Sequence, residues 1–357
     1  MAFEVTDAIQ RDSDIWRGLK AMPKIELHRH LEGSIRLPTL VEVAQQYDIP
    51  LPTYDVDVLR PYVQVTREDA PTHQQFLSKF SILRQFFVAE DVIRRVAREV
   101  VEDAAADNVR YMELRFTPIA LAKCMGFPLV DVMTWVNETV SETAAQLGIK
   151  VNLIVAVNRH ESVELAEQMM RLAVDFLGRG ITAVDLCGNE AGHPANAFTR
   201  LFLEAHQAGL GVTIHAGEWA GPENVIYAIQ HIKASRIGHG VRSVEDSVAL
   251  QLARDYGVYF EVCPTSNLQT GVVASVSQHP LIDLRFLDVK LTLNTDDPTV
   301  NNTTLTDEYA LAVQGLHFPI EYLQQCILNA IQGAFLTPSE KAALEAEFRT
   351  AFGGQVL

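Results

Sequence analysis

The hydrophobic residues cluster in short runs rich in valine, isoleucine and leucine, and longer amphipathic stretches separate these runs. The run Val151–Val157 is almost wholly apolar, which is typical of a strand buried on both faces of a parallel sheet. The pattern predicts eight strands: Lys24–Leu27, Val109–Phe116, Lys150–Val157, Ile181–Leu186, Gly211–Ile214, Arg236–Ile237, Val258–Val262 and Val289–Leu293. Strand and helix alternating about eight times indicate an α/β fold, a closed (β/α)₈ or TIM barrel.

The stretches between the strands have the spacing of amphipathic helices, and several end at a glycine such as Gly148 or Gly257. We expect a helical insertion after the first strand, Leu37–Phe87, to cap the barrel mouth, and a C-terminal segment, Ile320–Gly353, to form closing helices. No linker or internal repeat interrupts the chain, so residues 1–357 are expected to form a single domain. The predicted helices are Ala89–Ala106, Leu129–Leu147, Val163–Gly178, Pro222–Ile232 and Ser243–Tyr256.

Composition and charge argue against several classes of function and partner. The formal net charge of −16 makes nucleic acid an unfavourable partner, and no apolar run reaches the roughly 20 residues that cross a bilayer. The segment Met1–Gly18 carries several charges and has no apolar core, unlike a signal peptide. The four cysteines are far apart and form no C-x-x-C pair, which favours a reducing cytoplasm over a disulfide-bonded protein.

Histidines and carboxylates fall where four of the predicted strands end. His28 and His30 are two residues apart, so both side chains point to the same side of the strand. Barrel enzymes place their active sites at the C-terminal ends of the strands. The residues at the other three strand ends are His215 and Glu218, then His239, then Asp296 and Asp297.

Three imidazoles and one carboxylate can converge on one divalent ion, and this donor set suits zinc, although iron or another first-row metal is chemically possible. Each piece alone has a plainer interpretation, since H-x-H can be a hydrogen-bonded surface pair and Asp296-Asp297-Pro298 can be a turn. Together the pieces predict a metal-centred hydrolase of a C–N or ester bond, because a bound metal makes hydroxide available near neutral pH. Spacing alone does not name the bond.

The same stretches resemble the adenosine deaminase family, and they run from about Pro23 to Tyr309. The matching stretches are Lys24–Ser34, Asp185–Glu190, His215–Glu218, Arg236–Gly240, Glu261–Asn267 and Leu293–Thr299. The zinc deaminases with H-x-E and P-C-x-x-C signatures are a different class, and neither signature occurs here.

The resemblance implies one Zn²⁺ per chain and a small-molecule purine nucleoside as substrate. Adenosine or 2′-deoxyadenosine would be hydrolysed to inosine or 2′-deoxyinosine, with release of ammonia. Glu218 would protonate the purine nitrogen N1, and His239 and Asp297 would position and activate the hydroxide that attacks C6. Asp297 would also contact N7, and the Gly188 N–H would contact N3. The implied zinc ligands are His28, His30, His215 and Asp296, and the implied apolar lid residues are Phe76, Leu77 and Phe80.

One residue departs from the family pattern. Adenosine deaminases usually have an aspartate after H-x-H-L that binds the ribose 5′-hydroxyl, whereas this chain has Glu32, as related adenine deaminases do. Gly238, before His239, instead resembles the nucleoside enzymes, since the adenine enzymes usually have an aspartate at that place. The alternative substrates are therefore free adenine and a 5′-modified adenosine such as aminodeoxyfutalosine or methylthioadenosine. Two other functions also remain as alternatives, a catalytically inactive purine-binding protein and another metal hydrolase, because fold does not dictate function. The oligomeric state is left open.

Overall fold

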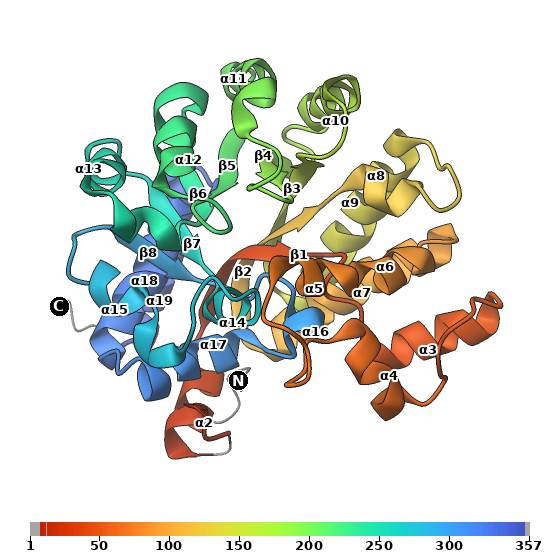
Figure 1. The fold of residues 1–357 in the computed structure, drawn as a ribbon, viewed down its shortest axis with the longest axis horizontal. Helices are drawn as coiled ribbons and strands as arrows, with labels where there is room; N and C mark the ends of the chain where they lie inside the picture. Colours follow the sequence, from red (N-terminus) through yellow and green to blue (C-terminus); the bar gives the residue numbers. More distant parts are fainter. Residues whose placement is uncertain (1–7, 12, 354–357) are drawn as a thin grey trace.

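Eight parallel strands form the centre of the molecule. The computed structural model describes residues 8–11 and 13–353. Within these residues the strands pair in the order β1-β2-β3-β4-β5-β6-β7-β8, and the helices surround them (Figure 1). The strands are β1 Lys24–His30, β2 Val109–Phe116, β3 Lys150–Asn158, β4 Ile181–Cys187, β5 Gly211–Ala216, β6 Arg236–His239, β7 Tyr259–Val262 and β8 Lys290–Leu293. The predicted (β/α)₈ barrel is confirmed.

The seam between β8 and β1 is closed by residues that follow β8. His30 N–H donates to the carbonyl of Asp296 at 2.8 Å, and Asp296 N–H donates to the carbonyl of His28 at 2.9 Å. Asp296 therefore lies directly beside the end of β1, although the two segments are far apart in the sequence. The closure of the barrel is what brings these three side chains together.

The outer helices follow the strands in turn, as the amphipathic patterns predict. The main outer helices are α7 Glu90–Ala106, α9 Leu129–Leu147, α10 Val163–Asp175, α11 Thr199–Gln207, α12 Pro222–Tyr227, α13 Ser247–Asp255, α15 Leu281–Leu284 and α18 Ile320–Gly333. Shorter or peripheral helices are α2 Asp14–Ala21, α8 Pro118–Ala122, α14 Pro264–Gln269, α16 Pro298–Asn301, α17 Leu305–Ala310 and α19 Pro338–Ala351. In the described residues, no helix has both the length and the apolar character needed to cross a membrane.

Several predicted boundaries were wrong. The strands β1, β5 and β6 continue further than expected, so that His28, His30, His215 and His239 are their last residues or nearly so rather than residues that follow them. The helix predicted over 243–256 is broken at Asp246, because this residue is extended and its side chain caps α13 by accepting the Val248 N–H. Polar residues at the ends of these strands interrupt the apolar pattern, so the pattern underestimates the length of the strands.

The helix predicted over 163–178 ends earlier, at Asp175, and α12 passes into a π-helical turn, Ala228–Ile232, before its end at Lys233. Part of the N-terminal segment Met1–Gly18, namely residues 1–7 and 12, lies outside the described residues.

The insertion after β1 consists of short helices rather than one long helix. They are α3 Leu37–Gln46, α4 Val56–Val63, α5 His73–Ser78, α6 Phe80–Leu83 and the 3₁₀ turn Arg84–Phe86. Gln64 and Val65 tie the insertion to the segment after β8, since the Gln64 Nε2 donates to the Thr299 carbonyl at 2.9 Å and the Val65 N–H donates to the Val300 carbonyl at 2.8 Å. The insertion is therefore fixed to the barrel mouth beside Asp296 and Asp297.

Arg236 cross-links the barrel interior. Its guanidinium is fully buried, lies 2.6 Å from Glu113 and donates to the carbonyl of Gly333 at 3.0 Å. It also stacks on Phe335, with 3.8 Å between the guanidinium carbon and the ring centroid. Removal of one partner from a buried ion pair leaves an uncompensated charge, which is costly.

We predict that Arg236→Met lowers the free energy of unfolding by about 3–5 kcal/mol, because Glu113 and Glu261 lose a buried counter-ion. Urea unfolding followed by circular dichroism measures the change. The matched control is Arg200→Met, which removes an exposed arginine paired with Glu204 and should change the value by less than about 1 kcal/mol. Equal losses in the two variants would contradict the prediction.

Candidate metal centre and active site

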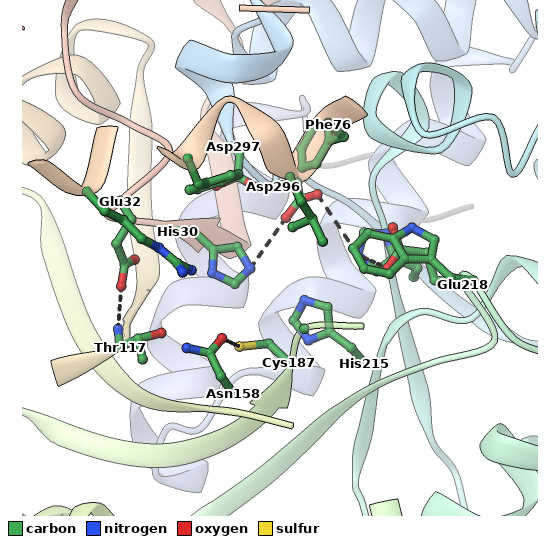
Figure 2. A pocket seen from close by; sticks show the side chains of 16 residues that line it. His30, Glu32, Phe76, Thr117, Asn158, Cys187, His215, Glu218, Asp296 and Asp297 are labelled. Atoms are coloured by element: carbon green, nitrogen blue, oxygen red, sulfur yellow. Dashed lines mark hydrogen bonds and ion pairs between the residues drawn. The ribbon is translucent and has the colours of Figure 1, made fainter. Parts of the chain in front are cut away.

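A single pocket at the C-terminal ends of the strands contains nearly all the predicted site residues. Counted with the space that is open to solvent, its volume is about 560 Å³. Figure 2 shows His30, Asp296 and Asp297 above His215 and Cys187, with Glu32 on one side of the pocket and Glu218 on the other. The predicted residues that line it are His30, Glu32, Phe76, Leu77, Phe80, Gly188, His215, Glu218, His239, Asp296 and Asp297.

Three of these side chains, with the fully buried His28, form a cluster of metal-ligand type. One donor atom from each of His28, His30, His215 and Asp296 lies within 4.8 Å of the others. The Oδ1 of Asp296 is 3.2 Å from His28 Nε2 and 3.4 Å from His30 Nε2. The His28 Nε2 is buried and makes no hydrogen bond. A buried imidazole nitrogen without a partner, aimed at a carboxylate and two further rings, fits a divalent metal.

A second group of the same kind contains His28, His239 and Cys263. Its thiol donates to the Glu261 carbonyl at 3.5 Å, and burial raises the pKa of Cys263 well above its usual value. A metal binds thiolate rather than thiol. The cluster with Asp296 is therefore the better candidate for the metal.

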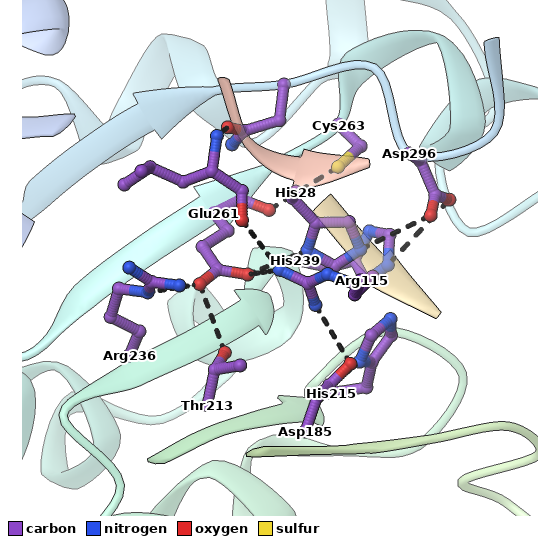
Figure 3. Close-up of polar contacts among 12 residues, drawn as sticks. His28, Arg115, Asp185, Thr213, His215, Arg236, His239, Glu261, Cys263 and Asp296 are labelled. Atoms are coloured by element: carbon purple, nitrogen blue, oxygen red, sulfur yellow. Dashed lines mark hydrogen bonds and ion pairs between the residues drawn. The ribbon is translucent and has the colours of Figure 1, made fainter. Parts of the chain in front are cut away.

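Buried carboxylates hold two of the imidazoles in place (Figure 3). His28 Nδ1 lies 2.8 Å from Glu261, and His215 Nδ1 lies 3.1 Å from Asp185. Each ring therefore donates its Nδ1 proton to a carboxylate and keeps the lone pair of Nε2 for a metal. Neither Glu261 nor Asp185 was assigned this role from the sequence, although both lie in the stretches that carry the family resemblance.

Arg115 on β2 connects these two carboxylates. It donates to Asp185 at 2.9 Å and to Glu261 at 2.7 Å. Although burial acts in the opposite direction, Arg115 and Arg236 hold the pKa of Glu261 well below its usual range. His215 and Arg115 lower the pKa of Asp185 against the same effect of burial. Both carboxylates therefore stay charged, which fixes the tautomers of the two histidines.

Glu218 lies in the turn after β5 and is buried. Burial raises the pKa of Glu218 well above its usual value, and the charges of Asp296, Glu190 and Asp297 act in the same direction. This environment favours the protonated carboxyl, which can donate a proton to a substrate. The Oε2 of Glu218 is 3.5 Å from His239 Nε2.

Glu190 holds the turn that presents Glu218. Its carboxylate accepts the backbone N–H groups of four consecutive residues, 217 to 220, at 2.7–3.2 Å, and the side-chain amide of Asn224 at 2.9 Å. This role could not be recognised from the sequence, because the partners are backbone groups of a turn that forms only in the folded chain. Glu190 does lie in the matching stretch Asp185–Glu190.

His239 and Asp297 complete the polar wall of the pocket. Burial lowers the pKa of His239 well below its usual value, so the ring is neutral and can accept a proton. The ring is held at Nδ1 by the amide of Asn267, 3.1 Å away. Burial, with Asp296 next, raises the pKa of Asp297 well above its usual value. A Cβ at Gly33 would overlap the Asp297 carboxylate, so this position requires a residue without a side chain.

The insertion supplies the apolar side of the pocket. Phe76, Leu77 and Phe80 line it. On the same insertion, His73 stacks on Trp219, with ring centroids 5.0 Å apart. The lining residues that sequence reasoning missed are Arg84, Thr117, Asn158, Cys187 and Trp219.

Comparison with known sequences identifies close relatives. The adenosine deaminase family matches residues 23–351. An adenosine deaminase of Clostridium botulinum is 36% identical over 326 residues, which is 91% of this chain and 98% of the relative. An adenosine deaminase of Klebsiella pneumoniae is 39% identical and covers 91% of this chain and 97% of its own.

Several solved structures are similar in fold to this chain. An adenine deaminase from Arthrobacter aurescens has a TM-score of 0.85 at 27% identity and covers 92% of this chain and 99% of its own. A Burkholderia ambifaria amidohydrolase with bound Zn has a TM-score of 0.86 at 26% identity, covering 97% of this chain and 96% of its own. An Arabidopsis protein, ADAL, complexed with IMP has a TM-score of 0.84 at 27% identity, covering 95% of this chain and 100% of its own.

We predict that Asp185→Asn weakens metal affinity by roughly 10- to 100-fold, because the amide is a poorer acceptor for the His215 Nδ1 proton. Competition with a chelator of known affinity measures the change. The control Asp175→Asn, at the exposed end of α10, should leave the affinity unaltered. Unchanged affinity in Asp185→Asn would show that Asp185 does not support a metal ligand.

Proposed function

Since the chain belongs to the adenosine deaminase family, we propose that it deaminates adenosine and 2′-deoxyadenosine to inosine and 2′-deoxyinosine, with release of ammonia. The family relationship makes it a hydrolase that acts on a purine C–N bond. The observation that carries the proposal is the convergence of four metal-type donors with Glu218, His239 and Asp297 in one pocket. We also propose that residues 1–357 act as one domain.

The family is one of metal-dependent amidohydrolases, and we assign the metal in this chain as one Zn²⁺. His28, His30, His215 and Asp296 would hold it, because imidazole and carboxylate suit zinc and a related amidohydrolase contains Zn. When bound, such a metal lowers the pKa of water toward about 7 and so supplies hydroxide at neutral pH. The remaining steps belong to the side chains of the chain itself.

Proton transfer is the task of Glu218 and His239. The protonated Glu218 donates to N1 of the purine, which makes C6 electrophilic. Neutral His239 accepts a proton from the attacking water as the new C6–O bond forms. The C6–N bond then breaks as the amino group takes up the proton held by His239 and leaves as ammonia, and the proton of the new C6 hydroxyl returns to Glu218 as the C6 carbonyl forms. His239 Nε2 lies 3.5 Å from Glu218 Oε2, so the two proton carriers lie side by side in the pocket.

Orientation of the base involves two further groups. Asp297, whose raised pKa favours the protonated carboxyl, donates to N7, and its other oxygen orients the attacking water. The backbone N–H of Gly188 donates to N3. Phe76, Leu77 and Phe80 cover the substrate and exclude bulk water.

Two local features favour a nucleoside over the free base. A Cβ at Gly238 would lie 3.0 Å from the His28 ring and 3.2 Å from the His215 ring, so the aspartate of adenine deaminases does not fit without displacement of these rings. The pocket also extends from Glu218 to Glu32 on its opposite side, so a group attached to the base can reach Glu32. ADAL holds the nucleotide IMP, which supports a substrate larger than the base here as well.

The free thiols of all four cysteines support a cytoplasmic location.

The direct test is incubation of the zinc-loaded protein with adenosine, 2′-deoxyadenosine and adenine, followed by ultraviolet absorbance and an ammonia assay. We expect turnover of both nucleosides with kcat/KM at least about tenfold above that of adenine, since the pocket beyond the base is then filled. Preferential turnover of adenine would contradict the nucleoside assignment. Tight purine binding without ammonia release would favour an inactive purine-binding protein.

We predict that Glu218→Gln lowers kcat by about 10²–10⁴-fold while the protein retains its metal, because the amide cannot supply the proton to N1. His215→Ala should lose both metal and turnover. Steady-state kinetics with metal analysis on each purified variant separates the two effects. A near-normal rate in Glu218→Gln would remove Glu218 from the mechanism.

A further inference from the structure

Arg84 lies at the mouth of the active-site pocket without a counter-ion. It begins the 3₁₀ turn Arg84–Phe86 of the insertion and lines the pocket together with Glu32. Its Nε is buried and has no hydrogen-bond partner, and no carboxylate of the described residues lies within 4.0 Å of its guanidinium. Its nearest described ring is Phe80, whose centroid is 5.6 Å from the guanidinium carbon. A buried donor left unpaired is costly, so a polar group that enters the pocket can stabilise the structure by pairing with it.

Glu32 is a second unsatisfied group near Arg84. One carboxylate oxygen of Glu32 accepts the Thr117 N–H at 2.6 Å, and the other is buried without a partner. Glu32 and Arg84 are close enough to interact electrostatically, yet they form no ion pair. Figure 2 shows Glu32 and Thr117 on the far side of the pocket from Glu218. A purine whose N1 meets Glu218 therefore directs its sugar end toward Glu32 and Arg84.

A second hollow opens on the other side of Arg84. Counted with the space that is open to solvent, its volume is about 560 Å³, and it shares Arg84 and Asn158 with the active-site pocket. Lys123 adds another cation to its wall, and its one carboxylate, Glu161, lies 3.5 Å from His160. In a molecule with a formal net charge of −16, two cations beside the active site stand out. No ion pair is formed by either cation within the described residues, so each is available to an anion.

We propose, on the basis of the deaminase function above, that the preferred substrate is an adenine nucleoside with an anionic group, carboxylate or phosphate, on its 5′ side, and that Arg84 binds this anion. Glu32 accepts a hydroxyl of the sugar, so both unsatisfied groups gain a partner. An anion satisfies Arg84 better than a neutral hydroxyl, because hydrogen bonds between charged partners are about twice as strong. Lys123 and the second hollow receive a substituent that extends beyond the sugar.

The experiment compares kcat/KM of the zinc-loaded protein for adenosine 5′-monophosphate, adenosine 5′-carboxylic acid and the neutral 5′-deoxyadenosine. We expect at least one anionic substrate to exceed the neutral one by roughly 10- to 100-fold. In Arg84→Gln this ratio should fall toward one, and Arg84→Lys should keep part of it. The ratio is measured within each variant, so incomplete folding does not affect it. The two anions distinguish a phosphate site from a carboxylate site.

The matched control is Arg171→Gln, which removes an exposed arginine far along the chain on α10 and should keep the wild-type ratio. A preference for 5′-deoxyadenosine over both anions, or a ratio that Arg84→Gln leaves unaltered, would overturn the proposal while the deaminase function stands. If no purine is deaminated, the proposed function fails, and calorimetric binding of inosine 5′-monophosphate against inosine still decides the role of Arg84.

Discussion

The buried guanidinium of Arg115 is the group on which the active site depends. It pairs with Asp185 and Glu261 in the barrel interior, where Arg236 is a second counter-ion of Glu261, and these carboxylates in turn orient His215 and His28. Without a counter-ion, neither carboxylate would stay charged so far from water. With the Nδ1 atoms of His215 and His28 held in this way, the lone pairs on their Nε2 atoms point toward Asp296. Charge pairing inside the barrel thereby prepares the donors before any ligand arrives.

Closure of the barrel places these donors at the pocket proposed to bind the substrate. The hydrogen bonds across the β8–β1 seam place Asp296 beside His28 and His30. The insertion is tied to the same segment through Gln64 and Val65, so the apolar lid and the metal-type donors share one support. On the opposite wall, Glu190 holds the turn that carries Glu218. These two segments therefore position Glu218, the proton donor, relative to the four metal-type ligand side chains.

The sequence predicts the barrel well because strands buried on both faces leave continuous apolar runs, as in Val151–Val157. The polar residues at strand ends were recognisable for the same reason, since His28 and His215 stand out after such runs. Boundaries were less predictable, because these histidines belong to the strands themselves.

The supporting residues escaped prediction for a different reason. Glu190 and Arg115 act on partners 27 or more positions away, and only the folded barrel brings these groups together. Arg84 lies in an insertion whose helices are short, and its position over the pocket depends on how those helices pack. Amphipathic spacing predicts helices there but gives no information on which polar residue faces inward.

The central claim is that the barrel directs four donors at one point. Anomalous X-ray scattering from crystals of the zinc-loaded protein tests this claim most directly. The account predicts one strong peak per chain, bounded by the Nε2 atoms of His28, His30 and His215 and the carboxylate of Asp296. A peak beside Cys263, two peaks in the pocket, or a zinc ion that any of these four side chains does not bind would contradict it.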